Sequence, residues 1–270
     1  MSLNFAASTS ARVDHGSAAS LDNLNPLTFW AWVYRTANGA NQEVITKDGA
    51  VNTGPLFIVD SSPGEGTLRF FRWMTGTNTD FASPAGAVPL NMPMFVAVTY
   101  DSSLATFVDL YTGTLVRPVT EVTYTATING TGTIEDDSAS LLYVGNVQRA
   151  PTSNFKGRIG WYGVLNRRLT QGQLEQIRTA PTIYDALLPG TVLLSGWQDT
   201  TATQIDLSGL GNHGTVTSAT VHEPLPARPY FVPIVGKRAS AAFDAALFPY
   251  PHADDFARRL DRMIPSGRIA

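Results

Sequence analysis

The stretch GRIGWYGVLNRRLTQGQLEQI, residues 157–177, changes its hydrophobic periodicity half-way along. Its first half alternates as a β-strand does, with bulky residues on both faces. In its second half, Thr170 precedes Gln173 by three residues, the spacing of a capping box that starts a helix. The stretch therefore predicts a strand followed by a short helix. One face of the predicted strand comprises Ile159, Trp161, Gly163 and Leu165.

Leu174 and Ile177 are the only apolar face of the predicted helix, so the helix must lie against a larger body. The chain has 270 residues, of which 43% are hydrophobic and 15% charged, and this is enough for one large core. Cysteine is absent, which excludes disulfides, thiolate metal sites and a cysteine nucleophile. We expect a β-sandwich stabilised by packing alone.

Four stretches resemble parts of a concanavalin A-like jelly roll of the laminin-G type. They are GRIGWYGVLNRRL (157–169), LTFWAWV (27–33), MFVAVTYD (94–101) and DLSGLGNHGTV (206–216). The resemblance covers residues 3–221 and implies an all-β, two-sheet antiparallel jelly-roll sandwich. It leaves function open, because the same sandwich serves lectins, glycan hydrolases, adhesion modules and virion proteins.

Alternation and turn signals predict the remaining strands and one long loop. Residues 75–89 are polar and rich in Gly, Pro and Asn, which predicts a surface loop, the kind of segment that carries binding. We therefore take Trp73 and Phe81 as candidate ligand-binding residues. The other predicted strands are 3–14 (an edge strand), 44–47, 56–60, 67–73, 95–100, 105–111, 119–128 and 192–197.

Trp30 and Trp32 alternate with apolar residues in the stretch 27–33. Large aromatic side chains are usually buried, which favours packing for both rings. The alternative is that they stack against a sugar.

The first candidate for metal binding is the acidic triplet Glu135, Asp136 and Asp137, and further possible ligands are Asp14, Asp101 and Asp109. Calcium needs six or more oxygen ligands, and one triplet supplies too few without partners elsewhere. A solvated turn is the alternative. We assign no metal ligand and no cofactor, and leave calcium binding unassigned.

Catalytic patterns are absent from the sequence. Glycan hydrolysis needs a pair of carboxylates across a cleft, and no Glu-x-Asp-x-Glu strand is present. The four histidines, His15, His213, His222 and His252, show no metal-ligand spacing. We expect a protein that is not an enzyme, with a glycan-active enzyme as the weakest alternative.

Beyond residue 223 the composition changes, which predicts a sandwich over residues 1–223 and an extended, partly helical arm over residues 224–270. The arm has seven Lys or Arg and four Asp or Glu, a net charge of +3, whereas the rest of the chain has twelve and eighteen, a net charge of −6. About forty residues cannot form a core alone, so the arm should dock on a partner. The apolar stripe predicted to dock consists of Phe256, Leu260, Met263 and Ile264.

These features favour a structural protein of a bacteriophage particle, a capsid decoration or tail-associated protein. The sequence starts without a secretory signal and has no run long enough to span a membrane, which is ordinary for a virion component made in the host cytoplasm. Capsid or tail proteins and sister subunits of a homo-oligomer are the expected partners. The charge imbalance is too mild for nucleic-acid binding. The main alternative is an extracellular carbohydrate-binding module for glycans.

Overall fold

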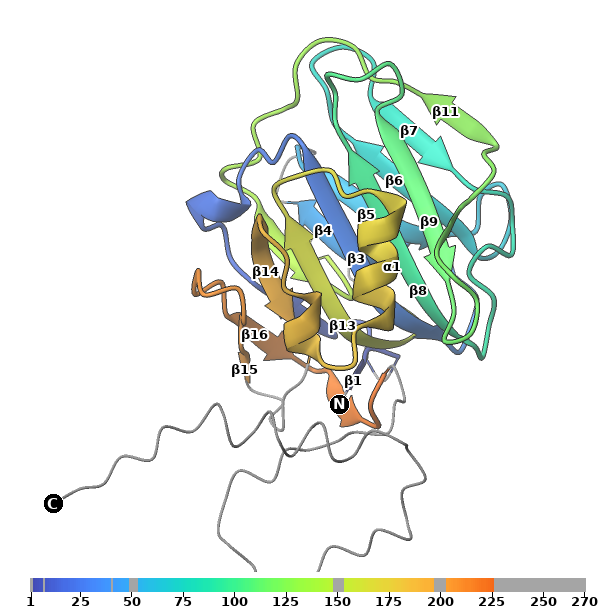
Figure 1. The fold of residues 1–270 in the computed structure, drawn as a ribbon, viewed down its shortest axis with the longest axis vertical. Helices are drawn as coiled ribbons and strands as arrows, with labels where there is room; N and C mark the ends of the chain where they lie inside the picture. The colour runs from blue at the N-terminus through green and yellow to red at the C-terminus, as the bar shows by residue number, and fades with distance from the viewer. Residues whose placement is uncertain are drawn as a thin grey trace, which may run out of the picture. The chain divides into compact units, whose positions relative to one another are not determined.

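In a computed structural model, the chain forms two antiparallel β-sheets that pack face to face (Figure 1). The structure describes residues 2–6, 8–39, 41–48, 53–147, 153–196 and 203–225. Over these ranges one α-helix, α1 (Gln171–Thr179), and two 3₁₀ turns, η1 (Ala19–Leu21) and η2 (Ile183–Ala186), accompany the strands. The predicted all-β jelly-roll sandwich is confirmed.

Sheet A has eight strands within the described ranges, in the order β10-β9-β8-β3-β13-β1-β17, with β14 also paired to β13. Their bounds are β1 (Ser2–Asn4), β3 (Leu27–Arg35), β8 (Pro93–Tyr100), β9 (Val108–Gly113), β10 (Thr120–Glu121), β13 (Gly157–Leu165), β14 (Thr191–Ser195) and β17 (Thr220–His222). The two predicted core strands, β3 and β8, pair along their length from Leu27 with Tyr100 to Tyr34 with Pro93.

Sheet B has nine strands in the same described part of the chain, in the order β11-β7-β6-β5-β4-β12-β2-β16-β15. Their bounds are β2 (Arg12–Asp14), β4 (Gln42–Asp48), β5 (Pro55–Asp60), β6 (Thr67–Arg72), β7 (Thr79–Ala82), β11 (Ala126–Ile128), β12 (Leu141–Val144), β15 (Thr203–Gln204) and β16 (Gly214–Thr217). Strands β4 to β7 follow one another in sequence and in space, so they form a meander.

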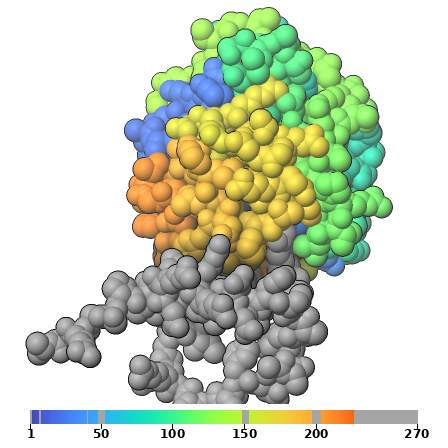
Figure 2. All heavy atoms as spheres, viewed as in Figure 1, coloured from blue at the N-terminus to red at the C-terminus, as the bar shows by residue number. Residues whose placement is uncertain are grey.

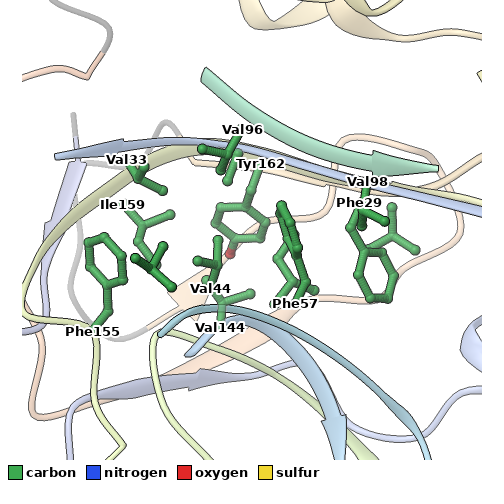
Figure 3. Close-up of a cluster of buried hydrophobic side chains, with 14 of the residues drawn as sticks. Phe29, Val33, Val44, Phe57, Val96, Val98, Val144, Phe155, Ile159 and Tyr162 are labelled. Atoms are coloured by element: carbon green, nitrogen blue, oxygen red, sulfur yellow. The ribbon is translucent and has the colours of Figure 1, made fainter. Parts of the chain in front are cut away.

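Apolar side chains from the two sheets meet in one core (Figure 3). Val96 and Val98 of sheet A point toward Val44 and Phe57 of sheet B, and all four are 0% exposed. Full burial of such a side chain stabilises the fold by about 1.5–3 kcal/mol. The core thus joins strands that are far apart in the sequence.

Strand β13 contains a β-bulge that changes which side chains face the core. Its pairing with β3 shifts register between Ile159 and Tyr162, and both residues belong to the inter-sheet core. One extra residue exchanges the two faces of a strand. The predicted face of Ile159, Trp161, Gly163 and Leu165 is therefore wrong, because the last three lie on the outer side. A Cβ at Gly163 would lie 2.6 Å from Trp30 Nε1, so only glycine fits there.

Helix α1 covers the outer face of sheet A, where its yellow atoms lie over the middle of the face in Figure 2. Thr170 Oγ1 accepts a hydrogen bond from Gln173 N at 3.3 Å, and Gln173 Oε1 accepts one from Thr170 N at 3.0 Å. This is the predicted capping box. Leu174 and Ile177 are both 0% exposed, so the short helix is held by packing.

Trp30 and Trp32 lie on this outer side of sheet A, because Phe29 and Ala31 beside them face the inter-sheet core. The two tryptophans are 1% and 0% exposed and flank Phe95, with ring centroids 6.0 and 5.7 Å from it. Buried rings offer no surface to a sugar. The packing alternative is confirmed for both residues.

Three predicted segments differ from the structure because long-range pairing divides them. Residues 3–14 form two strands, β1 in sheet A and β2 in sheet B, instead of one edge strand. Residues 75–89 contain β7, which pairs with β6 and β11. Residues 119–128 form β10 and β11, which also belong to different sheets.

The last described residue, Leu225, is packed against strand β13. Leu225 is 1% exposed, and its carbonyl oxygen accepts a hydrogen bond from Trp161 N at 3.3 Å. The packed body therefore extends two residues past the predicted boundary at 223. The docking residues predicted for the arm, Phe256, Leu260, Met263 and Ile264, lie outside the described residues.

Candidate functional site

The outer face of sheet B presents a row of side chains along β6. Leu68 and Phe70 belong to the core and are 0% exposed. The residues between and after them, Arg69, Phe71 and Trp73, therefore lie on the outer face, and each is partly exposed. Together with Asp60 and Asp80, which bind Arg69, we call this row the β6 face.

Two aromatic rings form one end of the β6 face. The ring centroids of Phe71 and Trp73 are 4.7 Å apart, and the planes meet at 73°, an edge-to-face contact. Leu56 of β5 pairs with Phe71 and is also partly exposed. The result is an apolar platform on an open sheet.

An arginine held by two carboxylates forms the other end. Arg69 donates to both oxygens of Asp80, from Nε at 2.8 Å and from Nη2 at 2.6 Å, and to Asp60 from Nη1 at 2.9 Å. The hydrogen bonds to Asp80 raise the pKa of Arg69 above its usual value. The side chains of Arg69, Asp60 and Asp80 are 26%, 5% and 16% exposed. The guanidinium group is thus fixed in position and still reachable from solvent.

A depression of about 190 Å³ adjoins the guanidinium group. Its other lining residues have small side chains: Ser62, Pro63, Ala82, Thr125 and Ala126. Thr125 is fixed by hydrogen bonds from Oγ1 to the carbonyl oxygens of Ala82 and Ser83 at 3.3 and 3.0 Å. Pockets for drug-sized ligands measure about 300–1,000 Å³, so this depression suits a smaller ring.

Of the two predicted ligand-binding residues, the structure places Trp73 on the β6 face and Phe81 elsewhere. Phe81 is 1% exposed and lies in the inter-sheet core. Because β7 turns its ring inward, Phe81 is not reachable by a ligand, which corrects the expectation for this residue. Sequence analysis missed Arg69 and Phe71, although the alternation in TLRFFRW (67–73) places both on the same face as Trp73.

Within the acidic triplet, Asp137 is bound by two cationic side chains. Asp137 is 1% exposed and binds Lys47 Nζ at 2.7 Å and Arg72 Nη2 at 3.1 Å. Asp136 accepts a hydrogen bond from Asn23 Nδ2 at 2.8 Å, which lowers the pKa of Asp136. Two cations already neutralise Asp137, so it is neither a metal ligand nor part of a solvated turn. Both interpretations of Asp137 are corrected.

In the part of the chain that the structure describes, no group of three or more His, Asp or Glu side chains is placed to hold a metal ion. His15 is 4% exposed, and its ring binds Tyr162 and the backbone of Asn212 instead of facing a cleft. None of the helices in the same ranges is long and apolar enough to cross a membrane.

The sequence of residues 7–175 matches the family model described as the concanavalin A-like lectin/glucanases superfamily. The chain belongs to this superfamily. The match covers more than half of the chain and includes every strand of the β6 face. No curated protein sequence is similar enough to the chain to match it.

One solved structure supports the fold, and two further ones show weaker similarity. A putative carbohydrate-binding protein from Bacteroides ovatus superposes with a TM-score of 0.55 at 16% identity, over 81% of this chain and 58% of that protein. This chain thus spans little more than half the length of that relative. Mouse laminin α1 domains LG4-5 superpose with a TM-score of 0.44 at 15% identity, over 63% of this chain and 43% of that one. The enzymatically active domain of bacteriophage CBA120 tailspike protein 2 superposes with a TM-score of 0.42 at 13% identity, over 57% of this chain and 24% of that one.

Proposed function

We propose that the protein is a non-enzymatic carbohydrate-binding protein whose binding site is the β6 face. The observation that carries this proposal is the combination, on one strand, of a fixed and accessible Arg69 with the aromatic pair Phe71 and Trp73. The lectin-like fold of the superfamily supports it.

The chemistry of the β6 face suits a sugar. One face of a sugar ring carries mainly C–H groups, which pack against an aromatic ring such as Phe71. The hydroxyl groups at the edge of the ring both donate and accept hydrogen bonds. Arg69 uses three of its five N–H groups on Asp60 and Asp80, and the two others are left to donate to a ligand. A ligand site usually combines a few polar groups with an apolar surface, as the β6 face does.

Binding without catalysis follows from the pairing of the two carboxylates. Hydrolysis of a glycosidic bond needs one carboxyl group as an acid and a second as a base or nucleophile. Asp60 and Asp80 instead share one guanidinium group, with Arg69 bound to both oxygens of Asp80. Neither is free for proton transfer to a sugar on this face.

The test is a glycan array followed by calorimetric titration of the best ligand. We expect Phe71→Leu, which keeps an apolar side chain but removes the flat ring, to weaken binding up to about tenfold, because an aromatic contact contributes about 0.5–1.5 kcal/mol and tenfold corresponds to about 1.4 kcal/mol. Tyr184→Ala is the matched control, since Tyr184 is an aromatic residue of η2 with 59% exposure. Equal affinity of wild type and Phe71→Leu would overturn the site, and no glycan binding at all would overturn the function.

A second candidate function is the structural role in a bacteriophage particle, as a capsid decoration or tail-associated protein in the virion. It is supported by the composition of residues 224–270 and by their net positive charge, which is opposite in sign to the net charge of the rest of the chain. Capsid or tail proteins and sister subunits are the proposed partners of the arm. The two functions are compatible, because the arm and the β6 face are separate parts of the sequence.

A further inference from the structure

We infer that the β6 face binds an uncharged oligosaccharide segment laid along β6, in preference to a single sugar or an acidic glycan. This inference rests on the proposed function of the same site. It follows from the length of the row, from its charge, and from the hydrogen-bonding groups that the ion pairs leave free.

The length of the row exceeds one sugar ring. Arg69 and Trp73 are four residues apart on an extended strand, which separates their Cα atoms by about 13 Å. The depression lies at the Arg69 end, and the aromatic pair lies at the other. One ring cannot fill the depression and cover Phe71 and Trp73 at once. A chain of two or three sugar units can contact both ends.

The charge of the row disfavours acidic ligands. Arg69 carries one positive charge and lies between the carboxylates of Asp60 and Asp80, so the three side chains together are net negative. The carboxylate of a uronic acid would compete with Asp80 for the same guanidinium fork. It would also be repelled by both aspartates, and this repulsion is strong only at low salt.

The free hydrogen-bonding groups match neighbouring hydroxyls. The Arg69 guanidinium keeps two N–H donors, while Asp80, at 16% exposure, keeps lone pairs on oxygens that already accept from Arg69. A donor and an acceptor side by side complement two adjacent hydroxyl groups, one accepting and one donating. A neutral sugar therefore satisfies the pair without breaking the bonds between Arg69 and Asp80.

The experiment titrates the full chain with unbranched neutral gluco- and manno-oligosaccharides of one to six units and with oligouronates of matched length. We expect affinity to rise about tenfold or more from one to three units and then to level off. A matched oligouronate should bind about tenfold more weakly at low salt, and the difference should narrow at high salt. Asp80→Asn should also narrow the difference in affinity between neutral and acidic chains, whereas Glu223→Gln, which removes an exposed negative charge next to β17 of sheet A, should leave that difference unchanged.

Three outcomes separate the inference from the proposed function. Oligouronates that bind as tightly as neutral chains, with binding lost in Phe71→Leu, would overturn the inference and keep the site. A single sugar that binds as tightly as a trisaccharide would also overturn it. If thermal melting shows that the wild type is folded and it still binds none of these glycans, the proposed function itself is overturned.

Discussion

His15 joins three distant parts of the sandwich through a buried ring. Its Nδ1 lies 2.7 Å from the carbonyl oxygen of Asn212, and its Nε2 lies 2.9 Å from the hydroxyl of Tyr162. A carbonyl oxygen only accepts, so Nδ1 carries the proton and Nε2 accepts from Tyr162. Burial lowers the pKa of His15 from 6.5 to about 4 and raises that of Tyr162. His15 is therefore neutral in the folded protein.

We predict that this ring makes the fold sensitive to mild acid. Between pH 6.5 and about 4, the unfolded chain binds a proton at His15 and the folded chain does not. The contribution of His15 to stability is complete above pH 6.5 and is lost as the pH falls through this window, by about 3 kcal/mol in total. Denaturant unfolding of the wild type and of His15→Gln across this range measures the difference.

The expected result is that His15→Gln is less stable near pH 7 but loses less stability on acidification. The titratable neighbours of the ring are Asp14, Asp206 and His213, and they are the same in both proteins. A parallel loss of stability in the two proteins would show that His15 does not set the acid sensitivity. His222→Gln, a change at an exposed ring, is the control.

At the scale of elements, β13 depends on its bulge. Trp161 lies within the bulge and is 2% exposed on the outer side of sheet A. Its backbone N–H donates to Leu225, and a Cβ at the neighbouring Gly160 would lie 1.8 Å from the same carbonyl oxygen. The bulge thus lies against Leu225, in the middle of β13.

We predict that Trp161→Ala lowers the free energy of unfolding by about 3–5 kcal/mol, because it removes a large buried side chain and leaves a cavity. Urea denaturation followed by circular dichroism gives the value. Tyr184→Ala, at a ring with 59% exposure, should change it by less than about 0.5 kcal/mol. An unchanged midpoint for Trp161→Ala would mean that the ring is exposed in solution.

At the scale of the whole molecule, the packed body includes Leu225, two positions past the boundary predicted from the sequence. Leu225 is 1% exposed, whereas Glu223 is exposed. A chain cut after 223 loses the Leu225 side chain and the bond to Trp161 N. A cut after residue 223 therefore removes part of the packed body.

We predict that a chain of residues 1–225 folds as a sandwich, and that a chain of residues 1–223 is less stable by about 1.5–3 kcal/mol, the burial of one leucine. If the protein has the proposed structural role in a bacteriophage particle, neither truncated chain should join that particle, because both lack the arm. In the full chain, the single substitution Leu260→Asp should weaken attachment to the particle, since it places a charge in the predicted apolar stripe. Co-sedimentation with particles that lack the protein measures attachment. Equal incorporation of residues 1–225 and the full chain would rule out an anchoring role for the arm.

The local pattern of the sequence determined the strand at 157–165, the capped helix α1, and the core strands β3 and β8. Each depends on alternation or on a spacing within a few residues, which the chain specifies by itself. The alternation of residues 67–73 places Arg69 and Phe71 on the same face as Trp73.

Only the tertiary structure decided what depends on partners far along the chain. The bulge in β13 exchanged the faces of Trp161 and Tyr162, because register is set by pairing with β3. Phe81 is a core residue because residues 79–82 form strand β7, which pairs with β6 and β11. Asp137 meets Lys47 and Arg72, which are 90 and 65 positions away in the sequence. A buried carboxylate needs cations, and the sequence does not show which distant cations the fold brings to it.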